Sequence, residues 1–286
     1  MLRKLFKYDF LAIGKTMWLF TILAVVAGII ASCIGIFMNK FYTESMPDYF
    51  QVSLGIMFVF LLIFCLYAIL AYLVLAIIMI LMRYYKNFFT DEGYLTFTLP
   101  VKTSTLLDAK ILSGILWVFI SLTVFFLCIL SFILFMGFDG NIKEMIESFD
   151  LYYAIPGFSY SSIFFDYYDM DPLISGILAT VSGLLRIVYF VFVMYFSVTF
   201  ASVVVKRARM VLGIVCFMGI NSVTSVGIFI ISLLLYTFLV DSDVPLMNPE
   251  HFTYLRYGIE YAVYGGLAVG AYFLNRYLLK NKLNLV

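Results

Sequence analysis

Residues 52–82 read VSLGIMFVFLLIFCLYAILAYLVLAIIMILM, a stretch without a single charged residue. A run of about 20 apolar residues is enough for a helix to cross the hydrocarbon core of a bilayer, and this run is longer. As one helix it would be roughly 45 Å long at ~1.5 Å per residue, so we expect it to tilt or to project beyond the hydrocarbon. The stretch predicts a membrane-spanning helix.

The whole chain has the composition of a membrane protein. Of its 286 residues, 64% are hydrophobic, 19% are aromatic and only 12% are charged, which is far outside the range of soluble domains. Inside lipid, every backbone N–H and C=O must be satisfied within the protein, so only helices and closed barrels cross a membrane. The long apolar runs do not alternate as barrel strands do. We therefore predict an all-α polytopic membrane protein.

Six apolar runs are long enough to cross a bilayer. They cover residues 17–38, 52–82, 111–136, 173–205, 211–240 and 257–279. We expect one transmembrane domain over residues 1–286, folded as a six-helix bundle. The longest segments between the spans are a loop over residues 83–110 and a loop over residues 137–172.

The positively charged residues predict the orientation of the spans, since cytoplasmic loops are enriched in Lys and Arg. With the N-terminus inside, fourteen of the 18 basic residues fall on the cytoplasmic side. They are Arg3, Lys4, Lys7, Lys15, Arg83, Lys86, Lys102, Lys110, Lys206, Arg207, Arg209, Arg276, Lys280 and Lys282. The outer side holds Lys40, Lys143 and Arg256. Both termini are thus expected on the cytoplasmic side of the membrane.

The first sixteen residues precede the first span and are amphipathic. Leu2, Leu5, Phe6, Phe10 and Ile13 recur at spacings of three and four, with the basic residues mostly on the other side. This pattern favours a helix over residues 1–16 that lies in the membrane interface. A plain positively charged topology anchor is the alternative.

The sequence lacks the patterns of an enzyme. Gly14-Lys15-Thr16 resembles the end of a P-loop, but Asp9 stands where the earlier Gly is required. His251 is the only histidine, which excludes multi-histidine metal sites. The net charge of +1 predicts no nucleic-acid partner. We expect no catalytic residue, no metal and no cofactor in this chain.

The most informative segment outside the spans is RYYKNFFTDEGYLTFTLPV, residues 83–101. An acidic residue precedes Gly93, Pro100-Val101 follows, and Leu106-Leu107 and Lys110 lead into the third span. This order resembles the pattern of the ABC-2 permease family, although Ala109 stands where the family usually has Gly. The opening Lys7-Tyr8-Asp9-Phe10 is similar to that of the small Firmicute permeases of this family.

The resemblance implies a function for the 83–110 loop. In the family this loop forms a coupling helix that docks on a separately encoded cytoplasmic ATPase, which binds ATP and Mg, and the permeases work as dimers. The resemblance assigns coupling roles to Asp91, Glu92, Gly93, Pro100 and Lys110. It also implies a second permease subunit, as a homodimer or a heterodimer. An ordinary cytoplasmic loop rich in turn residues is the alternative.

Several polar residues lie inside the predicted spans. Arg186 and Glu260 are costly to place in lipid, so we expect them to pair with each other or to snorkel to the nearer interface. The fifth run contains Asn221, Ser222, Thr224 and Ser225. These four residues can line a pathway, or they can bond back to their own helix.

Small residues form two stripes at helical spacing. Ala24, Gly28 and Ser32 lie in the first run, and Gly266 and Gly270 lie in the sixth. Such stripes permit close approach between helices, either within one subunit or across a dimer.

Taken together, these features predict the permease subunit of an ABC exporter in the bacterial cell membrane. The outer loops are rich in acidic residues and tyrosine, which suits an amphipathic or hydrophobic substrate such as an antimicrobial peptide or a drug. The alternative is an ATP-independent channel or a membrane-embedded interaction protein.

Overall fold

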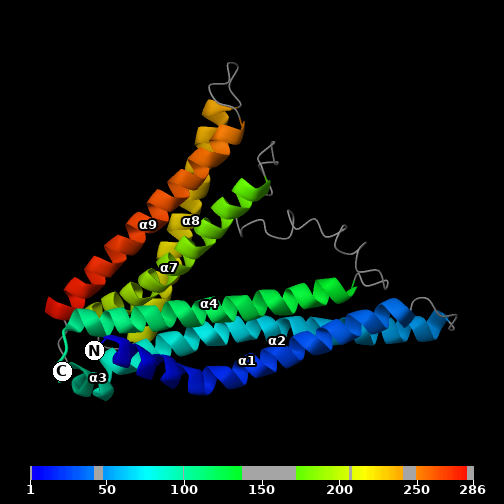
Figure 1. The fold of residues 1–286 in the computed structure, drawn as a ribbon, viewed down its shortest axis with the longest axis horizontal. Helices are drawn as coiled ribbons and strands as arrows, with labels where there is room; N and C mark the ends of the chain where they lie inside the picture. Colours follow the sequence, from blue (N-terminus) through cyan, green and yellow to red (C-terminus); the bar gives the residue numbers. More distant parts are fainter. Residues whose placement is uncertain are drawn as a thin grey trace. The chain divides into compact units, whose positions relative to one another are not determined.

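The computed structural model describes residues 2–41, 48–98, 100–136, 172–205, 208–240 and 249–281 (Figure 1). Over these residues the chain is helical and contains no strand. The helices are α1 (Leu2–Phe41), α2 (Asp48–Phe89), α3 (Asp91–Phe97), α4 (Thr103–Met136), α7 (Pro172–Val204), α8 (Arg209–Leu239) and α9 (Pro249–Asn281). The expected outer loop over 137–172 lies, apart from the start of α7, outside the described residues.

Five of these helices are long and apolar enough to cross a membrane: α1, α2, α4, α7 and α8. The sixth predicted span lies in α9, which has 33 residues but is not among the five. Its tyrosines and glycines, together with Arg256, Glu260 and Arg276, lower its mean hydropathy. The all-helical, multi-span character of the chain is therefore confirmed for the part that the structure describes, whereas a sixth crossing stays a prediction.

The amphipathic N-terminal segment differs from its expected form. Instead of a separate helix over 1–16, the structure has one continuous helix from Leu2 to Phe41. The apolar side of its first turns packs on α4. The ring of Phe10 stacks on Trp117 with centroids 5.0 Å apart, and Trp117 Nε1 donates a hydrogen bond to the Phe10 carbonyl at 3.2 Å. Protein therefore covers part of the face that we assigned to the membrane interface.

The chain forms two compact units, and the boundary passes through α2 and α4. Unit 1 comprises Met1–Arg83 and Asp108–Asp150, and unit 2 comprises Tyr84–Leu107 and Leu151–Val286. In unit 1, α1, α2 and α4 pack side by side around Ala31, Cys65 and Phe125 (Figure 1). One polar chain crosses all three helices. The hydroxyl of Tyr72 lies 3.1 Å from Thr21 Oγ1 on α1 and 3.4 Å from Ser121 Oγ on α4.

The small-residue stripe of α1 is used inside unit 1. A methyl group added to Gly28 would lie 2.8 Å from Cys128 Sγ on α4, so only glycine fits this approach. The neighbouring stripe residues also contact α4: Cys128 Sγ donates to the Ala24 carbonyl at 3.7 Å, and Ser32 Oγ donates to Ser131 Oγ at 3.2 Å. This stripe therefore serves contact within the subunit.

In unit 2, α7 is the central helix and packs against both α8 and α9. Tyr189 and Val193 of α7 share a core with Ile228 of α8 and with Tyr264 and Ala268 of α9. The buried residues of α8 are Gly213, Ile228 and Ser232, so most of its apolar surface is exposed. The second small-residue stripe makes no close approach among the described residues, because no atom lies within 4 Å of a methyl group added to Gly266 or Gly270.

Candidate coupling site

The loop after the second predicted span folds into the short helix α3, and local residues explain its limits. Thr90 is extended (φ −118°, ψ −172°) and separates α2 from α3. The N–H of Gly93 donates to the Thr90 carbonyl at 2.7 Å across this corner. Pro100 lacks an N–H and cannot continue the helix beyond Thr98. The Lys102 carbonyl then accepts from the first amides of α4.

The inner side of α3 is fixed to the end of α2. Gly93 is buried, and a methyl group added to it would lie 2.7 Å from the carbonyl oxygen of Phe88. Such a distance is sterically forbidden, so glycine is required at this position for packing. The ring of Phe97 lies 5.6 Å from the ring of Phe88. Phe88 therefore contacts α3 at both its start and its end.

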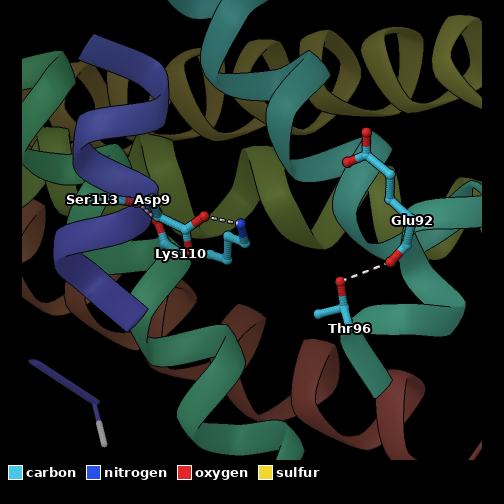
Figure 2. A network of polar contacts seen from close by, with 5 residues as sticks. All are labelled: Asp9, Glu92, Thr96, Lys110 and Ser113. Atoms are coloured by element: carbon cyan, nitrogen blue, oxygen red, sulfur yellow. Dashed lines mark hydrogen bonds and ion pairs between the residues drawn. The ribbon is translucent and has the colours of Figure 1, made fainter. Parts of the chain in front are cut away.

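The outer side of α3 presents charged and aromatic groups to solvent. Glu92 is exposed, Tyr94 is 66% exposed, and Pro100 is exposed just beyond the helix. Figure 2 shows the Glu92 carboxylate extending away from Thr96, whose hydroxyl donates to the Glu92 carbonyl at 2.9 Å. Asp91 is the first residue of α3, and its side chain lies outside the described part of the structure. The predicted coupling residues Glu92 and Pro100 are thus both accessible.

Lys110 is buried, unlike Glu92 and Pro100. It is 5% exposed, and its ammonium group forms an ion pair with the carboxylate of Asp9 on α1 (Figure 2). Both residues belong to unit 1, whereas α3 belongs to unit 2. The ion pair links α1 to α4 and buries the charge of Lys110, so the coupling role expected for this residue stays a prediction. A sequence pattern shows a lysine before a span but not the carboxylate that neutralises it.

Tyr84 forms a polar junction that the sequence did not reveal. It lies one helical turn before Phe88, is 1% exposed, and stacks on Tyr195 of α7 with centroids 4.1 Å apart. Its hydroxyl lies 2.8 Å from Thr199 Oγ1 on α7 and donates to Asn275 Oδ1 on α9 at 3.3 Å. The sequence indicates only that Tyr84, Thr199 and Asn275 each lie near the predicted cytoplasmic end of a different apolar run.

Arg186 and Glu260 form the ion pair expected from the sequence. Arg186 Nη2 on α7 lies 2.9 Å from Glu260 Oε2 on α9, and Ser182 Oγ donates to the same oxygen at 2.9 Å. The Arg186 guanidinium also lies 5.2 Å from the centre of the Tyr264 ring. The carboxylate is almost fully buried, so it depends on these donors for its stability.

The four polar residues of the fifth predicted span do not converge. Asn221 Nδ2 donates to the Phe217 carbonyl at 3.1 Å, and Thr224 Oγ1 donates to the Ile220 carbonyl at 2.7 Å. Thr224 also accepts from the Tyr189 hydroxyl at 3.1 Å, which is its contact with α7. Ser222 and Ser225 lie on the exposed side of α8. Asn221 and Thr224 thus bond back to α8, as expected if these polar residues satisfy their own helix and do not line a pathway.

Comparison with known proteins adds no relative: no family model, no curated protein and no solved structure matches the chain. No group of three or more His, Cys, Asp and Glu side chains that could hold a metal ion occurs among the described residues. A function can therefore be argued from the exposed surface of α3 and from the junction of Tyr84 on α2 with α7 and α9.

Proposed function

We propose that this chain is the membrane-spanning subunit of an ABC exporter, and that α3 docks on a separate cytoplasmic ATPase. The observation that carries the proposal is the short helix α3 itself. It stands between two long helices that are apolar enough to cross a membrane, and its inner side is anchored while its outer side is exposed. When a soluble partner moves such a helix, the movement can be transmitted to the membrane-spanning helices attached to it.

The docking surface consists of Glu92, Tyr94 and Pro100. An exposed tyrosine supplies contact area at low entropic cost, and the exposed carboxylate on the other flank of the buried Gly93 selects a partner with cations. The resemblance of residues 83–110 to the ABC-2 permeases supports the same assignment. ATP and Mg belong to the partner, because this sequence contains no P-loop.

The proposed topology has six spans with both termini in the cytoplasm. The asymmetry of Lys and Arg supports it, and it places α3 on the side where ATP is available. In this arrangement α9 provides the sixth span, with Glu260 neutralised by Arg186. The working unit is a pair of permease subunits, identical or different. It moves an amphipathic or hydrophobic substrate outward by alternating access.

A capture experiment with paired tyrosine variants tests the docking of α3. The detergent-solubilised chain would be isolated from its native membrane as wild type, as Glu92→Lys with Tyr94→Lys, and as Tyr277→Lys. Tyr277 is 54% exposed on α9 and controls for placing a lysine at an exposed tyrosine. We expect wild type and Tyr277→Lys to retain a P-loop protein that hydrolyses ATP, and the α3 variant to lose it.

Two outcomes would contradict the proposal. One is that a well-folded wild-type chain captures no ATPase, which would favour an ATP-independent channel or an interaction protein. The other is that the α3 variant retains the ATPase as well as Tyr277→Lys does, which would place docking elsewhere.

A further inference from the structure

The contacts behind α3 form a continuous path into the helices of unit 2. The path begins at Gly93, which presses against the Phe88 backbone, and at Phe97, whose ring meets the ring of Phe88. Because Phe88 contacts α3 at two points, a movement of α3 toward the end of α2 presses directly on this residue. The first step of the path is therefore steric.

The second step runs one turn back along α2. Tyr84 and Phe88 are four residues apart, and their ring centroids lie 5.0 Å from each other. Side chains at this spacing lie above one another on the same helical face. Both residues are almost completely buried, so the two rings lie against protein and not against solvent. We therefore expect a displacement of Phe88 to move the ring of Tyr84.

The third step is polar and joins three helices. The hydroxyls of Tyr84 and Thr199 are hydrogen-bonded to each other. Tyr84 also donates to Asn275 Oδ1, and Thr199 also donates to the Tyr195 carbonyl. Thr199 and Asn275 are no more than 1% exposed, so solvent does not reach their polar groups. In such surroundings a missing partner costs more than the bond contributes. The positions of α7 and α9 at this point therefore depend on the Tyr84 hydroxyl.

We propose that Tyr84 is the residue through which a movement of α3 reaches α7 and α9. A displacement of Phe88 moves the ring of Tyr84 by direct contact. The movement of that ring then changes the hydrogen bonds of the Tyr84 hydroxyl to Thr199 and Asn275. The role of this path in transport rests on the proposed function. The mechanical coupling itself is a property of this chain and needs no ATPase to be measured.

A double-mutant cycle with amide hydrogen exchange measures the coupling. Gly93→Ala displaces α3 from Phe88, and Phe97→Leu is a milder second perturbation in case the first variant does not fold. Each would be made in wild type, in Tyr84→Phe and in Tyr85→Phe. Tyr85 is the adjacent residue on α2, half-buried, and serves as the matched loss of a tyrosine hydroxyl. Exchange would be followed in residues 195–204 of α7 and 271–279 of α9.

In wild type and in Tyr85→Phe, we expect Gly93→Ala and Phe97→Leu to speed amide exchange in residues 195–204 and 271–279 by about fivefold. A fivefold change corresponds to the loss of about one net hydrogen bond. In Tyr84→Phe exchange is already faster, and the α3 variants add nothing further. Equal, additive effects in all three backgrounds would overturn the proposal, as would an effect confined to residues 84–98. Loss of ATPase capture with an intact cycle would remove the proposed function and leave the coupling standing.

Discussion

At the scale of single residues, two partly buried ion pairs hold helices together in the described part of the chain. Asp9 joins α1 to Lys110 at the start of α4, and Arg186 of α7 joins Glu260 of α9. Removing one partner of a buried pair leaves an uncompensated charge, whereas replacing both with apolar groups of similar size is often neutral. Each pair therefore adds little net stability, but a substitution of one partner alone is costly.

Lys110 gives a prediction that separates a structural role from a docking role. Lys110→Met leaves the partly buried Asp9 without this counter-charge, and we expect a loss of up to about 3 kcal/mol in stability. The double variant Asp9→Leu with Lys110→Met should recover most of that loss. Thermal unfolding in detergent would be followed by tryptophan fluorescence, since Trp117 packs on Phe10 beside the pair.

Lys102→Met is the matched control, because Lys102 is exposed and loses the same charge. A Lys110→Met protein as stable as this control would show that the ion pair contributes nothing. If the double variant were no more stable than Lys110→Met alone, the loss would come from lysine packing rather than from the unpaired carboxylate.

At the scale of elements, three close approaches between helices occur at glycine residues, where a side chain would not fit. Gly28 brings α1 against Cys128 of α4, and Gly93 brings α3 against α2. Gly213 similarly approaches the Val198 backbone, with 3.2 Å between an added methyl group and Val198 Cα. By contrast, no atom of the described residues lies within 4 Å of a methyl group added to Gly219 of α8. The same residue type thus has opposite consequences at different positions.

Alanine substitutions at two glycines should therefore change stability in opposite directions. Gly28→Ala forces α1 away from α4, and overpacking of this kind costs about 1–3 kcal/mol. Gly219→Ala meets no neighbour and removes a flexible residue from a helix interior, so we expect a gain of up to about 1 kcal/mol. Melting temperatures in one detergent compare the two. A rise for Gly28→Ala would contradict the close approach described for α1 and α4.

Hydropathy predicts the apolar part of each helix well and its ends poorly. The predicted span over 52–82 lies within α2, but α2 begins at Asp48 and continues to Phe89. Helical hydrogen bonding does not stop where lipid stops, so the additional turns leave no hydropathy signal. The N-terminal segment shows the same effect, because its helix continues into the first span without a break.

The candidate site could be found only in part from the sequence. Residues 91–100 stand out because Gly and Pro break a helical pattern and acidic residues lie beside them. Which of them face outward, and that Lys110 is buried, depends on contacts between distant segments. Tyr84 could not be singled out, since its partners Thr199 and Asn275 are 115 and 191 positions away.

At the scale of the whole molecule, the number of spans decides on which side of the membrane the chain ends. Five helices meet the length and hydropathy of a span, and α9 does not, yet α9 packs along α7 with a neutralised carboxylate. If α9 crosses the membrane, both termini share one side. If it lies outside, they are on opposite sides.

Reporter fusions distinguish these two arrangements. With six spans and a cytoplasmic N-terminus, a fluorescent protein fused after residue 286 should fluoresce, and alkaline phosphatase at the same position should be inactive. A phosphatase fused after residue 240 should be active, which provides the matched control on the outer side. Phosphatase activity at the C-terminus would contradict the six-span topology and the position of α9 within it.

The pair of Asp9 and Lys110 also has a consequence for the order of biogenesis. The two residues are 101 positions apart. At about 5–20 residues per second, a ribosome needs roughly 5–20 s to make the chain between them. During that interval the first turns of α1 have neither their counter-charge nor Trp117. An amphipathic helix without a protein partner rests on the membrane surface. We therefore expect the N-terminal segment to wait there and to dock only after the third span has been inserted.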